Sequence, residues 1–139
     1  MELKAKAFSE ALAGFELLIN HDLSALEGLD QVLLDGLANG KAQKFEYTLE
    51  LCWKAIKAYL QQVEGIEAAS PKQVVKAYFL SGHLGEDDYL LLIQAVDDRN
   101  RLSHIYDSET FDRIILRLGT YADLMRRVLV LLSQMKEAS

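Results

Sequence analysis

Residues 97–107, which read DDRNRLSHIYD, hold an unusual density of side chains that could do chemistry. This short span brings together Arg99, Asn100, His104 and Tyr106, whereas most of the chain is leucine, alanine and charge at helical spacing. On a continuous helix, Asn100 and His104 share a face because they are four residues apart. The long side chain of Arg99 can reach around to that face, so a guanidinium, an amide and an imidazole could converge on one ligand.

These three residue types suit a phosphate group. Arginine donates paired hydrogen bonds to two phosphate oxygens, and asparagine adds neutral hydrogen bonds. Histidine titrates near neutrality and can move a proton. RNA supplies its own nucleophile, the 2′-hydroxyl, so a base for that hydroxyl and a cation beside the phosphorus could cleave it without a metal.

Tyr106 and the helix end leave a structural interpretation open. Tyr106 lies two residues beyond His104, so it shares the site only if the helix loosens before Asp107, which is a candidate N-cap for the next helix. The alternative is that Arg99 and Arg101 simply contact carbonyls or carboxylates at a polar helix end.

The specificity of the motif depends on how much of it is counted. Arg-x4-His alone appears in roughly one of eight shuffled chains of this composition, as expected for a short motif. Arg-Asn-x3-His-x-Tyr appears on the order of once in ten thousand shuffles. The fuller pattern therefore favours a site over coincidence.

The chain shows no convincing metal set and no phosphate-binding glycine loop. His21, His83 and His104 lie far apart in the sequence and near no helix-spaced pair of carboxylates. No glycine-rich phosphate motif is present. We therefore expect neither a metal nor a cofactor.

Length and composition are those of a soluble globular protein, which we expect to form one domain over residues 1–139. The net charge of −6 and the pI of about 5.0 argue against a sequence-independent nucleic-acid coat, although a local basic pocket is compatible with them.

The single Cys52 has apolar neighbours and is predicted to be a small buried hydrophobe. The first fifteen residues lack the apolar core of a signal peptide, and the apolar runs are too short to span a bilayer, so a cytoplasmic protein is expected.

The elements that must position the motif are all predicted to be helices. The apolar spacing is helical nearly throughout, and no stretch alternates as a strand would. The predicted fold is all-α: an antiparallel up-down bundle of four main helices plus a short extra helix. The predicted segments are 3–19, 29–37, 45–63, a short helix from Pro71 to about Gly82, a helix from Gly85 into the motif, and a long last helix after Asp107.

Three local signals sharpen this prediction. A break or kink is expected at ANGK, residues 38–41, because glycine and asparagine interrupt helices. Ser70 and Gln73 predict a capping box, and Gly65 is expected to end the preceding helix. That helix should pack through a heptad-like seam consisting of Phe45, Leu49, Cys52, Ile56, Tyr59 and Val63.

Two stretches are apolar all round, namely residues 90–93 and 128–132. A small bundle has little interior in which to hide four consecutive apolar residues. A self-association face, most simply that of a twofold homodimer, is one explanation, and deep burial is the other.

The chain resembles the HepT-like proteins of the HEPN superfamily, which are also described as nucleotidyltransferase substrate-binding proteins. The resemblance rests on RNRLSHIYD at 99–107, on QKFEYTLELCWKAIKAYL at 43–60 and on SPKQVVKAYFLSGHL at 70–84. It covers most of the chain, from about residue 41 to residue 107.

The resemblance implies a helical homodimer in which two Arg-x4-His motifs approach each other, beside a small neighbouring nucleotidyltransferase of the MNT type. In toxin–antitoxin members the HEPN protein is a metal-independent ribonuclease, and the partner silences it by AMPylation of the motif's tyrosine. Carried over by position, Arg99 and His104 are the catalytic pair, Asn100 supports them, and Tyr106 is modified. An attached phosphate would occupy the site and repel RNA.

Two other functions stay open at this stage. One is a non-catalytic substrate-binding or regulatory subunit of the nucleotidyltransferase, and the other is a scaffold without a ligand. Asp98 and Arg101 are assigned structural roles. Glu46 and Glu50 are interpreted as solvated helix surface or, alternatively, as part of the partner interface.

Overall fold

The computed structural model describes residues 2–21, 30–104 and 107–138, and these form five helices with no strand among them. This confirms the all-α prediction. The helices are α1 (Glu2–Asn20), α2 (Gln31–Val63), α3 (Pro71–Leu80), α4 (Glu86–Leu102) and α5 (Ser108–Ala138). None of them is long and apolar enough to cross a membrane.

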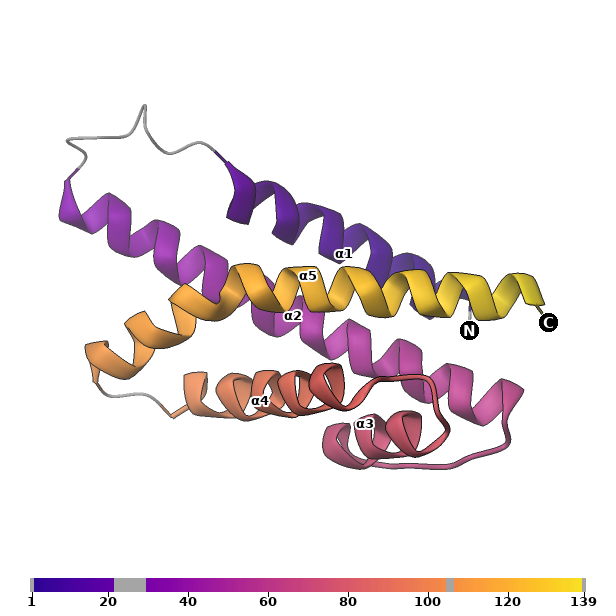
Figure 1. Cartoon of the computed structure of the whole chain (residues 1–139). Coiled ribbons are helices and arrows are strands. Elements are labelled where there is room, and N and C mark those ends of the chain that lie inside the picture. The colour runs from indigo at the N-terminus through magenta and orange to yellow at the C-terminus, as the bar shows by residue number, and fades with distance from the viewer. Residues whose placement is uncertain (1, 22–29, 105–106, 139) are drawn as a thin grey trace.

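The four long helices alternate in direction, and α3 is a short addition beside α4 (Figure 1). Helices α1, α2 and α5 pack against one another, while α3 and α4 pack on α2 and α4 also contacts α5. The C-terminal end of α4 and the N-terminal end of α5 therefore lie together at one end of the molecule, and the chain termini lie at the other (Figure 1).

An aromatic cluster joins the three central helices. Phe45 of α2 stacks on Tyr121 of α5 with ring centroids 5.3 Å apart, and it lies 6.3 Å from Phe15 of α1. All three side chains are fully buried. Burying each contributes on the order of 2 kcal/mol of hydrophobic stabilisation, so this cluster fixes how α1, α2 and α5 pack.

The predicted seam of α2 is confirmed except at its last position. Its first five members, from Phe45 to Tyr59, are buried, whereas Val63 is 44% exposed because it lies in the final turn of the helix. Cys52 is a free, fully buried thiol, as predicted, and burial raises its pKa. It is therefore a packing residue rather than a nucleophile.

The predicted break at residues 38–41 is wrong, because α2 runs without interruption from Gln31 to Val63. Gly36 and Gly40 lie inside it, and a glycine costs a helix interior only about 1 kcal/mol relative to alanine. Extending a formed helix is much easier than nucleating one, and the packed C-terminal part of α2 is a formed helix that residues 31–41 extend. The Asp30 carboxylate caps the free end by accepting a hydrogen bond from the Val32 amide.

The predicted helix ends at Gly65 and Ser70 are confirmed. Gly65 has φ 67°, the left-handed conformation in which glycine commonly ends a helix, and the following amide of Ile66 donates back to the carbonyl of Leu60 at 2.9 Å. Ser70 and Gln73 form the reciprocal capping box at the start of α3.

The two apolar runs are buried on one side and exposed on the other. Leu92 and Val128 are fully buried, whereas Leu90 is 56% exposed and Val130 is 46% exposed. Packing inside the bundle therefore accounts for the buried apolar residues of each run. It does not account for the exposed apolar residue that each run also contains.

Candidate functional site

The motif lies where α4 ends and the chain turns towards α5. Helix α4 ends at Leu102, and the amide of His104 donates to the carbonyl of Arg101 at 2.9 Å in the turn that follows. The helix therefore loosens before Asp107, as predicted. Asp107 caps α5, since its carboxylate accepts from the amide of Thr110 at 2.8 Å.

Arg99 is directed at α2. Its Nη2 lies 3.1 Å from a carboxylate oxygen of Glu50, and its Nε donates to the carbonyl of Glu46 at 3.4 Å. The side chain is partly buried between the two helices. Arg99 thus contacts a carbonyl and a carboxylate, as the structural interpretation of the motif predicted, and it ties the end of α4 to α2. Local sequence did not reveal that the partners lie on α2.

Glu50 is the residue that holds Arg99, and it does not stand free in solvent as one interpretation predicted. Its carboxylate also accepts a hydrogen bond from the Trp53 indole at 3.1 Å and pairs with Lys54 at 3.1 Å. Burial raises the pKa of Glu50, but these hydrogen bonds and the two neighbouring cations outweigh that effect and hold the pKa below its ordinary value. Glu50 is therefore a carboxylate that keeps its negative charge facing Arg99.

Asn100 and His104 are exposed, and neither side chain forms a hydrogen bond with any residue that the structure describes. Tyr106 lies outside the described residues. The structure therefore places Arg99 against α2 and leaves Asn100 and His104 open to solvent, without direct contact among the three side chains. Both exposed groups are accessible to a ligand.

Beneath the motif lies a buried carboxylate, Asp98, which is fully inaccessible to solvent. Arg101 contacts it at 2.7 Å, Arg117 of α5 contacts both of its oxygens at 2.9 and 3.1 Å, and the Tyr121 hydroxyl donates to it. Burial, followed by the hydrogen bond to Asp98, raises the pKa of Tyr121 and keeps the hydroxyl protonated. The network agrees with the structural roles assigned to Asp98 and Arg101, and it joins α4 to α5.

The other arginines of α5 differ in how they are paired. Arg126 binds Glu16 of α1, and Arg127 binds Asp88 of α4 at 2.9 Å. Arg113 makes no ion pair within the described part of the chain, and its contact is with the Thr110 hydroxyl at 3.4 Å. Arg113 is thus the α5 arginine whose charge is not neutralised at short range.

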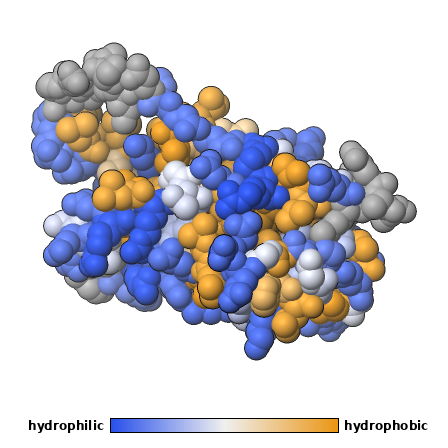
Figure 2. Space-filling view, in the orientation of Figure 1, coloured by the Kyte–Doolittle hydropathy of each residue, from blue (hydrophilic) through white to orange (hydrophobic). Residues whose placement is uncertain are grey.

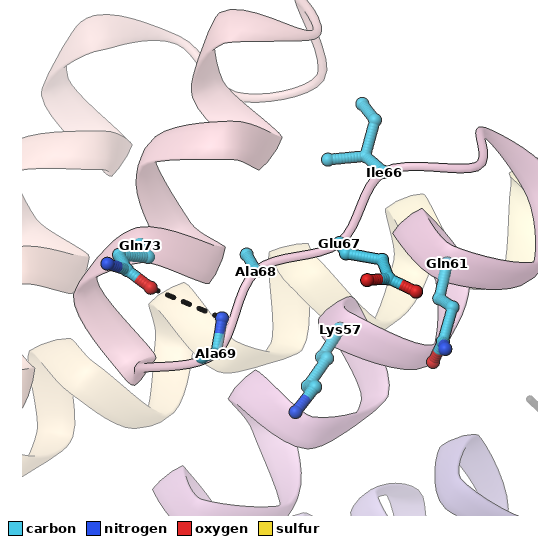
Figure 3. A pocket seen from close by; sticks show the side chains of 7 residues that line it. All are labelled: Lys57, Gln61, Ile66, Glu67, Ala68, Ala69 and Gln73. Atoms are coloured by element: carbon cyan, nitrogen blue, oxygen red, sulfur yellow. Dashed lines mark hydrogen bonds between the residues drawn. The ribbon is translucent and has the colours of Figure 1, made fainter.

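Two hollows lie on the surface near these elements. One of about 560 Å³ runs between α4 and α5 and includes Asp98, Arg101 and Arg113. The other, of about 420 Å³, lies between the end of α2 and the start of α3, where Lys57 and Gln73 border it (Figure 3). The second hollow shares no residue with the motif. Within residues 2–21, 30–104 and 107–138, no three His, Cys, Asp or Glu side chains are placed to hold a metal ion.

The fold and the site define an all-helical protein whose candidate site is a polar motif at the end of α4. The model of the family "nucleotidyltransferase substrate binding protein like" matches residues 3–135. The chain belongs to this family, which confirms the resemblance seen in the sequence. No protein with a curated description matches the chain by sequence.

Solved structures share the fold. A crystal structure of a protein from Thermus thermophilus is 36% identical, with a TM-score of 0.77, and the match covers 90% of this chain and 98% of that chain. HI0074 from Haemophilus influenzae is 24% identical, with a TM-score of 0.79 and coverage of 93% and 98%. The HI0074 structure is described as revealing the fold of a substrate-binding domain of a nucleotidyltransferase.

Proposed function

We propose that this protein is a metal-independent ribonuclease toxin that a partner nucleotidyltransferase inhibits by AMPylation of Tyr106. The observation that carries the proposal is the exposed, unengaged His104 at the end of α4, one short turn from Arg99 and Asn100. An imidazole that forms no hydrogen bond within the described residues is available as a base, and the adjoining amide and guanidinium suit a phosphate.

The proposed reaction is a transesterification within RNA. His104 removes the proton of a 2′-hydroxyl, whose oxygen forms a bond to the adjacent phosphorus as the bond from phosphorus to the 5′-oxygen breaks. The products are a 2′,3′-cyclic phosphate and a 5′-hydroxyl, whose proton comes from an acid. Arg99 stabilises the charge that develops on the phosphate oxygens, and Asn100 helps to orient them.

Arg99 can contribute while it remains bound to α2. Its Nε and Nη2 contact Glu46 and Glu50, whereas its Nη1 has no partner among the described residues. The pairing with Glu50 fixes the direction of the guanidinium, at the cost of offsetting part of its charge. A phosphate arriving at the free edge would therefore meet a pre-positioned cation.

We also propose that the active form is a homodimer. In such a dimer a second His104 can supply the acid that protonates the leaving 5′-oxygen. The exposed Leu90 and Val130 within the two apolar runs support an apolar contact between copies. Light scattering should give the mass of two chains at micromolar concentration, and a clean monomer would contradict this part of the proposal.

The control by Tyr106 has a direct test in cells. Expression of the chain alone should arrest growth and degrade RNA in the cytoplasm, whereas co-expression with the neighbouring nucleotidyltransferase should restore growth. Mass spectrometry should then show the addition of AMP, because the Tyr106 oxygen bonds to the α-phosphorus of ATP and pyrophosphate leaves. The attached anionic phosphate would occupy the phosphate site and repel RNA. Tyr106→Phe should lose the addition and stay toxic with the partner present.

Tyr59→Phe serves as the matched control, since Tyr59 is a buried tyrosine of α2. It should be modified and silenced like the wild type. Unmodified Tyr106 beside an active partner would refute the regulatory step. Harmless expression of the wild type without its partner, with RNA intact, would refute the toxin itself.

A second candidate is a non-catalytic substrate-binding or regulatory subunit of the nucleotidyltransferase. The observation that favours it is the Arg99–Glu50 pair, which offsets part of the charge that a nuclease would use. The family description and that of HI0074 also point to this role. Under this alternative, the chain would raise the activity of the partner enzyme, and Arg99→Ala and His104→Ala would leave cell growth unchanged.

A further inference from the structure

The groove between α4 and α5 is not lined by Arg99, which is directed at α2. Its α4 wall includes Asp97 and Arg101, and its α5 wall includes Arg113 and Arg117. The hollow has a volume of about 560 Å³. Figure 2 shows strongly hydrophilic residues gathered over the N-terminal turns of α5, where this groove lies.

The groove carries an excess of positive charge. Asp97 is neutralised from outside by Lys72 of α3 at 2.5 Å. Asp98 pairs with both Arg101 and Arg117, so a single negative charge balances only one of the two positive charges. Arg113 adds a further charge that forms no ion pair within the part of the chain that the structure describes.

Arg113 interacts with Asp107 through charge. The Arg113 charge contributes to the lowered pKa of Asp107, although the hydrogen bonds from Thr110 are the largest cause. Asp107 is exposed and already accepts from both the amide and the hydroxyl of Thr110. Arg113 forms no ion pair within the described residues, so its charge is available to a ligand, in a chain whose net charge is −6.

The floor of the groove holds its cations in place. The Asp98 carboxylate is fully buried and also accepts a hydrogen bond from the Tyr121 hydroxyl. Its position is therefore fixed by the protein. Arg101 and Arg117 contact the same oxygen of Asp98, which keeps their guanidinium groups adjacent, while both side chains stay partly exposed. A pair of fixed, partly exposed guanidinium groups is a pre-organised site for an anion with several oxygens.

We infer that this groove binds phosphate groups of an RNA chain on one side of the phosphate that is cleaved at His104. Arg101 lines the groove near the end of α4, and the backbone of His104 lies against it in the next turn, because the His104 amide donates to the Arg101 carbonyl at 2.9 Å. The groove therefore adjoins the turn that carries His104. Arg113 and Arg117 are one helical turn apart, about 6 Å along the axis, which is of the order of the separation of successive phosphates. The assignment to RNA rests on the proposed function.

The test measures binding without cleavage. A fluorescein-labelled decamer of single-stranded 2′-O-methyl RNA lacks the nucleophile, and fluorescence anisotropy over a series of salt concentrations gives its affinity. Arg113→Gln should weaken binding roughly threefold to tenfold and reduce the slope of log affinity against log salt by about 0.7, which corresponds to one lost phosphate contact. Because Arg113 makes no ion pair within the described residues, this variant should keep its fold and its melting temperature.

Arg127→Gln is the matched control. It removes the same charge from α5, but from a position paired with Asp88 and remote from the groove. Its affinity should stay within about twofold of the wild type and its salt slope should be unchanged. Equal losses in both variants would overturn the inference, because they would show a general charge effect rather than a groove.

Further experiments distinguish an RNA chain from a free nucleotide as the ligand, and the groove proposal from the nuclease proposal. Displacement of the decamer by ATP at matched phosphate concentration would overturn the assignment to an RNA chain. If the protein cleaves RNA but Arg113→Gln binds the decamer like the wild type, the groove is refuted and the nuclease stands. If binding depends on Arg113 but the wild type cleaves no RNA, the groove stands and the nuclease is refuted.

Discussion

Replacing His104 by alanine should reduce RNA cleavage by about 10²- to 10⁴-fold, the usual contribution of a general base. His104 is exposed and forms no side-chain hydrogen bond within the described part of the chain, so its removal should not disturb the fold. The loss should appear in the rate of the chemical step. RNA binding should be nearly unchanged, since the arginines make the main contacts proposed for the phosphate chain.

The measurement is single-turnover cleavage of a labelled RNA by purified protein, with enzyme in excess and a chelator present. The matched control is His21→Ala, because His21 is also exposed but lies at the end of α1, far from the motif in the chain. It should cleave like the wild type. Equal rates for His104→Ala and the wild type would remove His104 from the mechanism, and the second candidate function would then be favoured.

Replacing Asp98 by alanine should lower the free energy of unfolding by about 3–5 kcal/mol, as expected when one partner of a buried charge pair is removed. The carboxylate is fully buried and joins Arg101 on α4 to Arg117 and Tyr121 on α5. Without it, the Tyr121 hydroxyl would lose its acceptor and the two guanidinium groups would repel each other.

Chemical denaturation followed by circular dichroism measures the effect. Asp88→Ala is the matched control, because Asp88 also joins α4 to α5, through Arg127, but is partly exposed. It should cost about 1 kcal/mol or less. Tyr121→Phe should cost about 1–2 kcal/mol, since it deletes one hydrogen bond to the same carboxylate and keeps the ring. If Asp98→Ala costs no more than Asp88→Ala, the network does not hold α4 to α5.

The helix boundaries show what short-range information can predict. Local sequence is enough to predict three helix ends, namely the caps at Ser70 and Asp107 and the termination at Gly65. Each depends on side chains and amides within a few residues. The break at residues 38–41 was the wrong prediction, because the cost of two glycines is small compared with the stabilisation that α2 gains from packing elsewhere.

The candidate site also has features that the local sequence determines and features that depend on tertiary structure. The sequence alone determined the all-α class, the family resemblance and the identity of Arg99, Asn100, His104 and Tyr106 as a polar set on one stretch. Helical periodicity and residue type are local properties, and they do not depend on how the helices pack against one another.

Tertiary structure alone decided which of these groups are engaged. It paired Arg99 with Glu50, buried Asp98 beneath the motif and left Arg113 in the α4–α5 groove without an ion pair to any residue that the structure describes. These contacts join residues from separate helices, 49 positions apart in the case of Arg99 and Glu50. Their energies depend on distance and burial between those helices, which residue spacing along one helix does not encode.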